Sequence, residues 1–303
     1  MSQKSSNDYF FGLKVERLDR ANLCVIGFQW DRSSTYRKGS KEAPSVIRRM
    51  TTAKLYDPFS EEGVDLRPIW YVYDYGDVES ASSVPEMRER VYEVIRHLHN
   101  DELRFLFLGG DHLITYFALH TLTRLSKDSW ALIYLDSHLD LLEELEGDRY
   151  SHGCVVRRLV EETSLAPHSI IEVGARSLQP SEQKFADNAG TGIMSTVEFN
   201  RLGATEAAKR VSELLPEDVE RVYLSIDLDI LDPAYAPASC YPEPGGISTR
   251  NLIDFICGLD GLEIGAFDVV ELCPQFDCSS ITAIGVGKII LETLGKMKPT
   301  PKT

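Results

Sequence analysis

Short apolar runs recur along the chain, and β-branched and large side chains dominate them. The runs that predict strands are Leu23 to Phe28, Leu103 to Leu108, Trp130 to Leu135, Ile170 to Val173, Val222 to Ile226 and Ile264 to Val270. They are apolar at successive positions rather than at alternate ones, which is typical of strands buried on both faces. The pattern therefore predicts the centre of a parallel sheet.

Helical patterns lie between several of these runs. Ser83 and Glu86 have the spacing of a capping box, and the apolar residues behind them fall on one helical stripe: Met87, Val91, Val94, Ile95 and Leu98. A similar stripe follows Ser248 and Thr249: Leu252, Ile253, Ile256 and Leu259. Strands that alternate with helices predict an α/β fold in which helices cover both faces of the sheet.

The chain shows no sign of a division into parts. No stretch rich in Gly, Ser or Pro separates two cores, and no repeat of fixed period stands out. We therefore expect a single domain over residues 1–303, with a polar N-terminal extension to about residue 20 and a frayed tail over about 296–303.

Charge narrows the classes of partner. The 303 residues include 47 acidic and 32 basic side chains, for a formal net charge of −15. Such a surface repels phosphate backbones and anionic lipid headgroups, so we expect neither a nucleic acid nor a membrane as partner. The polar first residues and the lack of a long apolar run predict a cytoplasmic protein.

The cysteines predict reduced thiols. They are scattered and form no C-x-x-C pair: Cys24, Cys154, Cys240, Cys257, Cys273 and Cys278. A chain of this length builds a core without disulfides, and even the closest pair, Cys273 and Cys278, lacks the spacing of a zinc site.

Acids and histidines follow three of the predicted strands. Gly109 to His112 comes after the second run, Asp136 to Asp140 after the third, and Asp227 to Asp229 at the end of the fifth. Open parallel sheets bind ligands beyond the carboxyl ends of their strands. In extended chain, same-face side chains such as those of Asp136 and His138 lie roughly 6.5 Å apart, which suits ligands of two metal ions.

Each of these signals, taken alone, has a structural interpretation that involves no metal ion. An isolated D-x-D is more often a turn or a helix cap, and a lone histidine is usually solvated or hydrogen-bonded. We apply the latter interpretation to four others: His97, His99, His120 and His168. Four aspartates at one sheet edge, however, would repel each other strongly unless cations neutralised them. Two His and four Asp without a thiolate favour Mn²⁺ over zinc, with Mg²⁺, Fe²⁺ and Co²⁺ left open.

These segments, in this order, resemble the ureohydrolase superfamily, which includes arginases, agmatinases and related amidinohydrolases. The matching segments are Gly109 to His112, Asp136 to Asp140, Ser151 to Gly153, Ser225 to Pro233 and Glu271 to Pro274. The resemblance runs from about Cys24 to the last helix. It implies a three-layer α/β/α sandwich with a mainly parallel sheet, a hydrolase of linear amidines, two Mn²⁺ per subunit, and a homo-oligomer, either trimer or hexamer.

The resemblance also implies a role for each matched metal ligand. His112 and His138 each hold one metal ion. Asp136 and Asp227 bridge the two ions. Asp140 and Asp229 complete the two coordination shells.

Three residues match the family's catalytic positions. A guanidinium is a poor electrophile, so its hydrolysis near neutral pH calls for a water whose pKa a metal has lowered. By resemblance, Asp140 hydrogen-bonds this nucleophile and passes a proton to the leaving amine. Glu271 orients the guanidinium through charge-assisted hydrogen bonds, and His152 shuttles protons at the cavity mouth.

Within the superfamily the sequence favours agmatinases, which release urea from agmatine and leave putrescine. Leu142 stands where arginases have an Asn that binds the amino-acid end of the substrate, and the turn at 174–179 lacks their acids. The segments Asp148 to His152 and Pro242 to Gly246 are similar to agmatinases. A small cationic guanidino substrate would also be drawn to an acidic cavity.

One loop leaves the exact substrate open. Residues 238–241 replace a loop that usually reads Gly-Thr-Gly-Thr, so Ser239 and Tyr241 are candidate substrate contacts, and the Tyr241 phenol stands in place of a small hydroxyl. It can supply that hydroxyl from another angle, narrow the pocket, or select an N-substituted agmatine or a guanidino acid.

Three alternatives stay open. One is another ureohydrolase, acting on a guanidino acid, arginine or formiminoglutamate. The second is a deacetylase of the same architecture with a single zinc ion. The third is a metal-binding homologue without activity, although a scaffold has no evident need of His152 and Glu271.

Overall fold

The computed structural model describes residues 8–297 and 299. Its core is one sheet of eight parallel strands in the order β2-β1-β3-β8-β7-β4-β5-β6. The strands are β1 (Leu23–Phe28), β2 (Val72–Val78), β3 (Arg104–Leu108), β4 (Trp130–Leu135), β5 (Ile170–Ala175), β6 (Gly192–Ser195), β7 (Arg221–Asp227) and β8 (Ile264–Val270).

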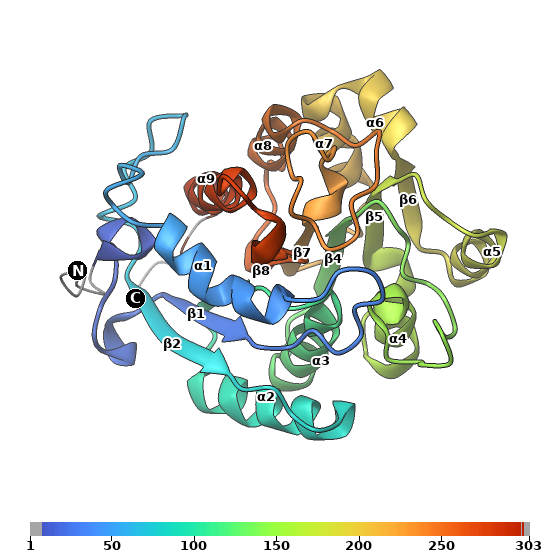
Figure 1. Ribbon diagram of the computed structural model, residues 1–303, viewed down its shortest axis with the longest axis horizontal. Coiled ribbons are helices and arrows are strands. Elements are labelled where there is room, and N and C mark those ends of the chain that lie inside the picture. The colour runs from blue at the N-terminus through green and yellow to red at the C-terminus, as the bar shows by residue number, and fades with distance from the viewer. Residues whose placement is uncertain (1–7, 298, 300–303) are drawn as a thin grey trace.

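Helices cover both faces of this sheet (Figure 1). The α-helices are α1 (Ala43–Met50), α2 (Val84–Leu98), α3 (Leu113–Leu125), α4 (Val155–Glu162), α5 (Pro180–Ala189), α6 (Thr196–Leu202), α7 (Ala204–Leu214), α8 (Thr249–Cys257) and α9 (Ile281–Lys296). Single 3₁₀ turns lie at Phe10–Gly12, Leu18–Arg20, Ser40–Glu42, His152–Cys154, Pro167–Ser169, Leu228–Ile230 and Pro274–Phe276. No helix within residues 8–297 is long and apolar enough to cross a membrane.

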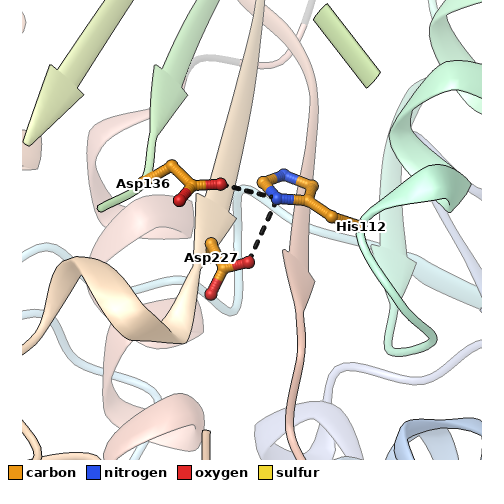
Figure 2. A group of neighbouring side chains, drawn as sticks. All are labelled: His112, Asp136 and Asp227. Atoms are coloured by element: carbon orange, nitrogen blue, oxygen red, sulfur yellow. Dashed lines mark ion pairs between the residues drawn. The ribbon is translucent and has the colours of Figure 1, made fainter. Parts of the chain in front are cut away.

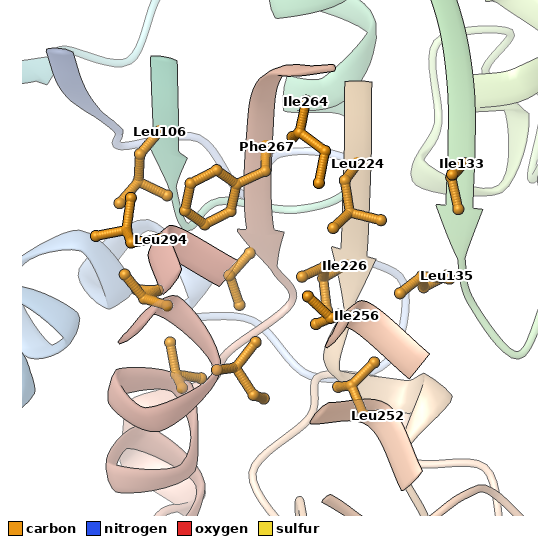
Figure 3. Packing of buried hydrophobic residues seen from close by; sticks show 14 of the residues in the cluster. Leu106, Ile133, Leu135, Leu224, Ile226, Leu252, Ile256, Ile264, Phe267 and Leu294 are labelled. Carbon is orange, nitrogen blue, oxygen red and sulfur yellow. The ribbon is translucent and has the colours of Figure 1, made fainter. Parts of the chain in front are cut away.

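Two apolar cores lie on the two sides of the sheet. One packs α1 and α6 to α9 against it, and the other packs α2 to α5 against the opposite face. Neighbouring residues of one strand enter different cores: Leu224 and Ile226 of β7 belong to the first, shown in Figure 3, and Tyr223 to the second. This explains the apolar residues at successive positions and confirms the expected three-layer α/β/α sandwich with a parallel sheet.

The predicted helix starts are also present. The Ser83 hydroxyl caps α2 by accepting a hydrogen bond from the backbone N–H of Glu86, and Ser248 caps α8 in the same way through Asn251. Such caps satisfy N–H groups that have no partner inside the helix.

Two edge strands, β2 and β6, were not among the predicted runs. β2 has the sequence Val-Tyr-Asp-Tyr-Gly-Asp-Val and is mostly half-buried. Its Asp74 and Asp77 form ion pairs with Arg48 of α1, 2.9 and 2.5 Å long. A strand at the edge of a sheet needs no continuous apolar run, so the criterion that located the central strands overlooks it.

The expected terminal extensions need adjustment. Residues 1–7, 298 and 300–303 lie outside the described part. Phe10 and Phe11, expected within a polar extension, are instead buried in the core. Lys296, expected in the frayed tail, is the last residue of α9, and its Nζ donates a hydrogen bond to the carbonyl of Cys257.

Candidate metal centre

Four neighbouring strands bring the candidate ligands together. In the middle of the sheet the order is β3-β8-β7-β4, and all four strands run in the same direction. His112 follows β3, Glu271 follows β8, Asp227 ends β7 and Asp136 follows β4. Residues far apart in the sequence therefore converge at one sheet edge, where parallel sheets bind their ligands.

Two glycines aim His112 at this edge. Gly109 and Gly110 have φ angles of +67° and +87°, in the left-handed region that favours glycine. A Cβ on Gly109 would lie 2.7 Å from Pro44 Cδ, and one on Gly110 would lie 2.9 Å from the carbonyl oxygen of Trp30. Both positions therefore require glycine, for the backbone conformation and because a side chain would clash with neighbouring residues. The turn made by the two glycines places His112 directly before α3.

His112 is the centre of a first group of ligand atoms (Figure 2). Its Nδ1 lies 2.9 Å from Asp136 Oδ2 and 3.1 Å from Asp227 Oδ2, and all three residues are buried. Asp140 Oδ2 lies 3.6 Å from the same nitrogen. One nitrogen facing three carboxylates is a donor set that can hold a divalent cation.

His138 is the centre of a second group. Its Nδ1 lies 3.2 Å from Asp136 Oδ1 and 3.0 Å from Asp229 Oδ2. Asp136 thus directs one oxygen to each histidine, the arrangement required of a carboxylate shared by two metal ions. Asp227 differs, because it belongs to the His112 group alone; its Oδ1 accepts a hydrogen bond from the backbone N–H of Asp229, 2.8 Å away. Its bridging role stays a prediction.

The electrostatics indicate that this site needs cations. Burial and then the neighbouring charges of Asp229 and Asp136 raise the pKa of Asp227 well above its usual value, and burial and Asp136 do the same for Asp140. Burial would also raise the pKa of Asp136, but hydrogen bonds from His112 and His138 outweigh it and lower that pKa. Buried carboxyls whose pKa is raised by neighbouring carboxylates are typical of a site with too little positive charge. The donor set, rich in oxygen and without sulfur, fits Mn²⁺.

Glu271 lies behind His112 with one oxygen unpaired. Its backbone has a φ angle of +62°. Oε1 accepts a hydrogen bond from the backbone N–H of His112, 2.7 Å away, and lies 3.7 Å from His152 Nδ1. Oε2 is buried and has no hydrogen-bond partner among the described residues. An unpaired buried carboxylate oxygen is costly, and a cationic ligand would satisfy it.

His152 and Tyr241 lie at the wall of a cavity of about 310 Å³ next to the metal groups. His152 Nε2 lies 3.1 Å from the hydroxyl oxygen of Thr35, and burial together with the charge of His138 lowers the pKa of His152 to about 4. Tyr241 is 41% exposed, and its ring stands edge-on to those of His138 and Tyr36 at centroid distances of 5.3 and 5.7 Å.

The rest of the cavity lining is apolar, acidic and neutral polar, the last through Thr35, Ser177 and Gln179. Three leucines line it: Leu142, Leu145 and Leu178. Glu146 and Glu182 supply carboxylates, and no Lys or Arg is among the described residues that line it. Ser239 is not among them either: it is buried, and its hydroxyl accepts a hydrogen bond from the backbone N–H of Tyr241, 3.3 Å away. Ser239 thus supports the loop instead of lining the cavity.

One expectation about cysteine was wrong. Cys240 and Cys273 form a disulfide with a Cα–Cα distance of 5.3 Å, whereas all thiols were expected to be reduced. The bond joins the loop of Tyr241 to the segment after Glu271. Backbone pairing brings the two cysteines together, since Cys240 N–H donates to the carbonyl of Glu271, 2.9 Å away. The two cysteines are 33 positions apart in the sequence, so no local pattern signals this contact.

Tyr134 is a site residue that the sequence interpretation missed. It belongs to β4, inside a fully apolar-looking run, and was treated as a core residue. Its ring stacks on that of His112 with a centroid distance of 4.3 Å, and its hydroxyl donates to Asp140 Oδ2, 2.5 Å away. The sequence did offer one signal: the hydroxyl group of Tyr134 comes two residues before Asp136 and so belongs to the same face of the strand. The four histidines interpreted as ordinary belong to neither ligand group.

Comparisons with known proteins agree with this geometry. The chain is 32% identical over 280 residues to the guanidinopropionase of Pseudomonas aeruginosa, covering 89% of this chain and 85% of the relative. It is 30% identical over 290 residues to the agmatinase of Halalkalibacterium halodurans, covering 94% and 95%. The crystal structure of a hypothetical agmatinase from Burkholderia thailandensis superposes with a TM-score of 0.85 at 26% identity, covering 98% of this chain and 96% of that one. A family model described as the Arginase family matches residues 21–295, and the chain therefore belongs to that family.

Proposed function

We propose that this protein is a manganese-dependent amidinohydrolase that converts agmatine, or a close derivative of it, to urea and putrescine or the corresponding amine. The observation that carries the proposal is the chemistry of the cavity. It begins at His138 and Asp140, is walled by leucines, and has carboxylates but no Lys or Arg among its described lining residues.

Six residues would hold two Mn²⁺ ions: His112, Asp136, His138, Asp140, Asp227 and Asp229. When bound, the ions would neutralise the excess of carboxylates and supply a water of lowered pKa as nucleophile. The residues around them then have the tasks of binding and orienting the guanidinium and of moving protons.

The guanidinium end would be held by Glu271 and its surroundings. Oε1 of Glu271 is fixed by the backbone N–H of His112, so Oε2 is the oxygen that can accept hydrogen bonds from a substrate. A carboxylate paired with a guanidinium fixes the plane of that group as well as its position. Asp140 is held by Tyr134 and would pass the proton to the leaving amine.

The tail of the substrate would lie along the outer cavity. Leu142, Leu145 and Leu178 offer apolar contact to a chain of methylenes, and Glu146 offers negative charge to a terminal ammonium. Arginine, guanidino acids and formiminoglutamate all carry a carboxylate in place of a simple ammonium tail. In this lining that carboxylate would meet like charges without a cation to pair with, so agmatine fits better.

The test is a comparison of substrates with the Mn²⁺-loaded protein. We would measure urea from agmatine, aminopropylagmatine, arginine, guanidinobutyrate and guanidinopropionate, and formamide from formiminoglutamate. We expect kcat/KM for agmatine or its derivative to exceed that for every carboxylate-bearing compound by at least about 10-fold, the equivalent of ~1.4 kcal/mol. Preference for a guanidino acid would overturn the substrate assignment, and no turnover of any compound would favour the non-catalytic homologue.

A matched pair of variants makes the charge argument specific. Glu146→Gln removes one negative charge from the cavity lining, whereas Glu213→Gln removes one from an exposed position of α7. Glu146→Gln should raise KM for agmatine and reduce the ratio of kcat/KM for agmatine to kcat/KM for guanidinobutyrate. Glu213→Gln should leave KM and this ratio at their wild-type values.

A further inference from the structure

Asp268 is a fully buried carboxylate in the middle of β8, beneath the proposed metal centre. Its Oδ2 accepts hydrogen bonds from the hydroxyls of Thr115 and Tyr223, each 2.7 Å away. Its Oδ1 accepts from the hydroxyl of Ser225 at 2.9 Å and from the backbone N–H of Ile226 at 3.2 Å. Four donors converge on one carboxylate in the apolar interior of the sheet.

Counting protons in this network shows which way each hydrogen bond runs. The backbone N–H of Ile226 can only donate, and each hydroxyl has a single proton to give. Thr115 Oγ1 also lies 3.2 Å from Ser225 Oγ, but its contact with Asp268 is shorter, so Thr115 donates its hydrogen bond to Asp268. Ser225 likewise donates its hydrogen bond to Asp268, and toward any other neighbour it can therefore only accept.

The other neighbour of Ser225 is His112. Its Nε2 lies 2.8 Å from Ser225 Oγ. Because Ser225 must accept in this contact, Nε2 of His112 carries the ring proton. A histidine that binds a metal ion does so as the neutral ring, and with the proton on Nε2 its lone pair is on Nδ1, the nitrogen that faces Asp136 and Asp227.

We propose that Asp268 is a positioning residue for metal binding, which acts through Ser225 to keep the lone pair of His112 on the nitrogen directed at the metal site. Asp268 lies outside the motif residues that the sequence interpretation selected. This inference rests on the proposed function only in that the two ligand groups hold metal ions. It adds a determinant of how tightly the His112 group holds its ion.

The decisive variant is Asp268→Asn. An amide has the same shape, but its NH₂ must face either the pair Ser225 and Ile226 or the pair Thr115 and Tyr223, all of which donate to it in the native protein. If the NH₂ faces Ser225, that hydroxyl loses its acceptor; if the NH₂ faces Thr115 and Tyr223, Ser225 keeps only a neutral amide oxygen, which is a weaker acceptor than a carboxylate. In both cases Ser225 donates more readily to His112 Nε2, which moves the ring proton to Nδ1 and removes the lone pair from the metal side. We expect the Mn²⁺ dissociation constant of one site to rise about 10–100-fold, the usual cost of losing such an outer partner.

The measurement is bound Mn²⁺ per chain, by elemental analysis after dialysis against a series of buffered free Mn²⁺ concentrations. At a concentration that saturates both wild-type sites, Asp268→Asn should hold close to one ion. Ser225→Ala breaks the same connection and should give the same loss. The double variant should lose little more than either single one, since both changes interrupt one chain of hydrogen bonds.

Tyr223→Phe is the matched control. It deletes one donor to Asp268 but leaves the path from His112 through Ser225 intact. Thermal unfolding of the metal-free variants separates a folding defect from a binding defect, and Ser225→Ala serves as the test if Asp268→Asn does not fold. We expect Tyr223→Phe to bind two ions, as wild type does.

The outcomes distinguish this inference from the proposed function. If Asp268→Asn and Ser225→Ala bind two ions as tightly as wild type, or if Tyr223→Phe loses as much, the positioning role is overturned. If wild type binds two ions and the two variants lose one, yet no guanidino compound is hydrolysed, the positioning role stands and the proposed function does not. A wild type that binds no divalent ion would overturn both.

Discussion

The backbone N–H of His112 donates a hydrogen bond to Oε1 of Glu271, 2.7 Å away, and so joins the loop after β3 to the segment after β8. The same side chain of Glu271 is buried and leaves Oε2 unpaired among the described residues. One oxygen thus anchors the carboxylate to the protein, and the other is available to a ligand. The contact makes the orientation of Glu271 depend on the backbone that also places His112.

Glu271→Gln tests this division of tasks. The glutamine carbonyl can still accept the hydrogen bond from His112, which leaves an NH₂ group facing the guanidinium, donor against donor. We expect kcat/KM for the best substrate to fall by at least about 100-fold while bound Mn²⁺ stays at the wild-type level. Urea release and elemental analysis of the same preparation check this. Unchanged kinetics would remove Glu271 from the substrate site.

Asp227→Asn should have opposite effects on metal binding and on metal-free stability. The change removes a ligand charge from the His112 group, so we expect loss of at least one Mn²⁺ per chain and of most activity. It also removes a carboxyl whose pKa is raised by burial and by Asp229, which is a sign of repulsion in the folded state. The metal-free variant should therefore unfold at a temperature equal to or above that of metal-free wild type.

Thermal unfolding with and without Mn²⁺ measures both effects of Asp227→Asn. Asp187→Asn, an exposed position on α5, is the matched control for the loss of one negative charge. It should leave the Mn²⁺-induced rise in melting temperature as in wild type. Full Mn²⁺ binding by Asp227→Asn would contradict its role as a ligand.

The central strands were predictable because of where they lie in the fold. Strands β3, β8, β7 and β4 are covered by helices on both faces, so burial imposes apolar residues at most positions, and this pattern can be read directly from the sequence. The edge strand β2 is held partly by ion pairs between its Asp74 and Asp77 and Arg48 of α1, and these depend on tertiary contact between the strand and the helix. Such pairing leaves no periodic pattern in the chain.

The site shows the same division between local and tertiary information. Asp136, His138 and Asp229 belong to short motifs at strand ends, and their positions after predicted parallel strands indicated that they would meet. Tyr134 occupies a position inside an apolar run, where only its hydroxyl, two residues before Asp136 on the same strand face, distinguishes it from a core residue. The disulfide between Cys240 and Cys273 depends on pairing of two distant loops, which only the folded chain reveals.

The metal-free protein should lose stability as the pH rises from 5 to 8. Burial raises the pKa of Asp140 and Asp227, so their contribution is present at low pH and is lost as the pH rises through the folded-state value. For His112 and His138, nearby aspartates outweigh burial and raise the pKa, so their contribution is present below about 6.5 and is likewise lost above it. His152, with a pKa of about 4, acts in the opposite direction as a single group.

A melting curve at each pH, in chelator and in Mn²⁺, measures this dependence. In chelator the melting temperature should fall by several degrees across the window, about what 1–2 kcal/mol produces in a chain of this size. In Mn²⁺ the trend should reverse, because metal binding requires deprotonated ligands and so becomes tighter as the pH rises. A metal-free protein that gains stability over this range would contradict the charge distribution of the site.

Tyr241 should control which substrates enter, through the size of its ring. The ring lies edge-on to those of His138 and Tyr36 at the cavity wall, on a loop fixed by the disulfide to Cys273. Tyr241→Ser would open the wall and should raise kcat/KM for aminopropylagmatine relative to agmatine by about 10-fold, within the range that a pocket obtains from steric fit. Tyr241→Phe keeps the ring and removes only the hydroxyl. The same ratio of kcat/KM values, measured for this variant, therefore separates a role of the ring's bulk from a role of the hydroxyl. A ratio close to wild type in Tyr241→Phe assigns the selectivity to the bulk of the ring, whereas a change as large as that in Tyr241→Ser would assign it to the hydroxyl.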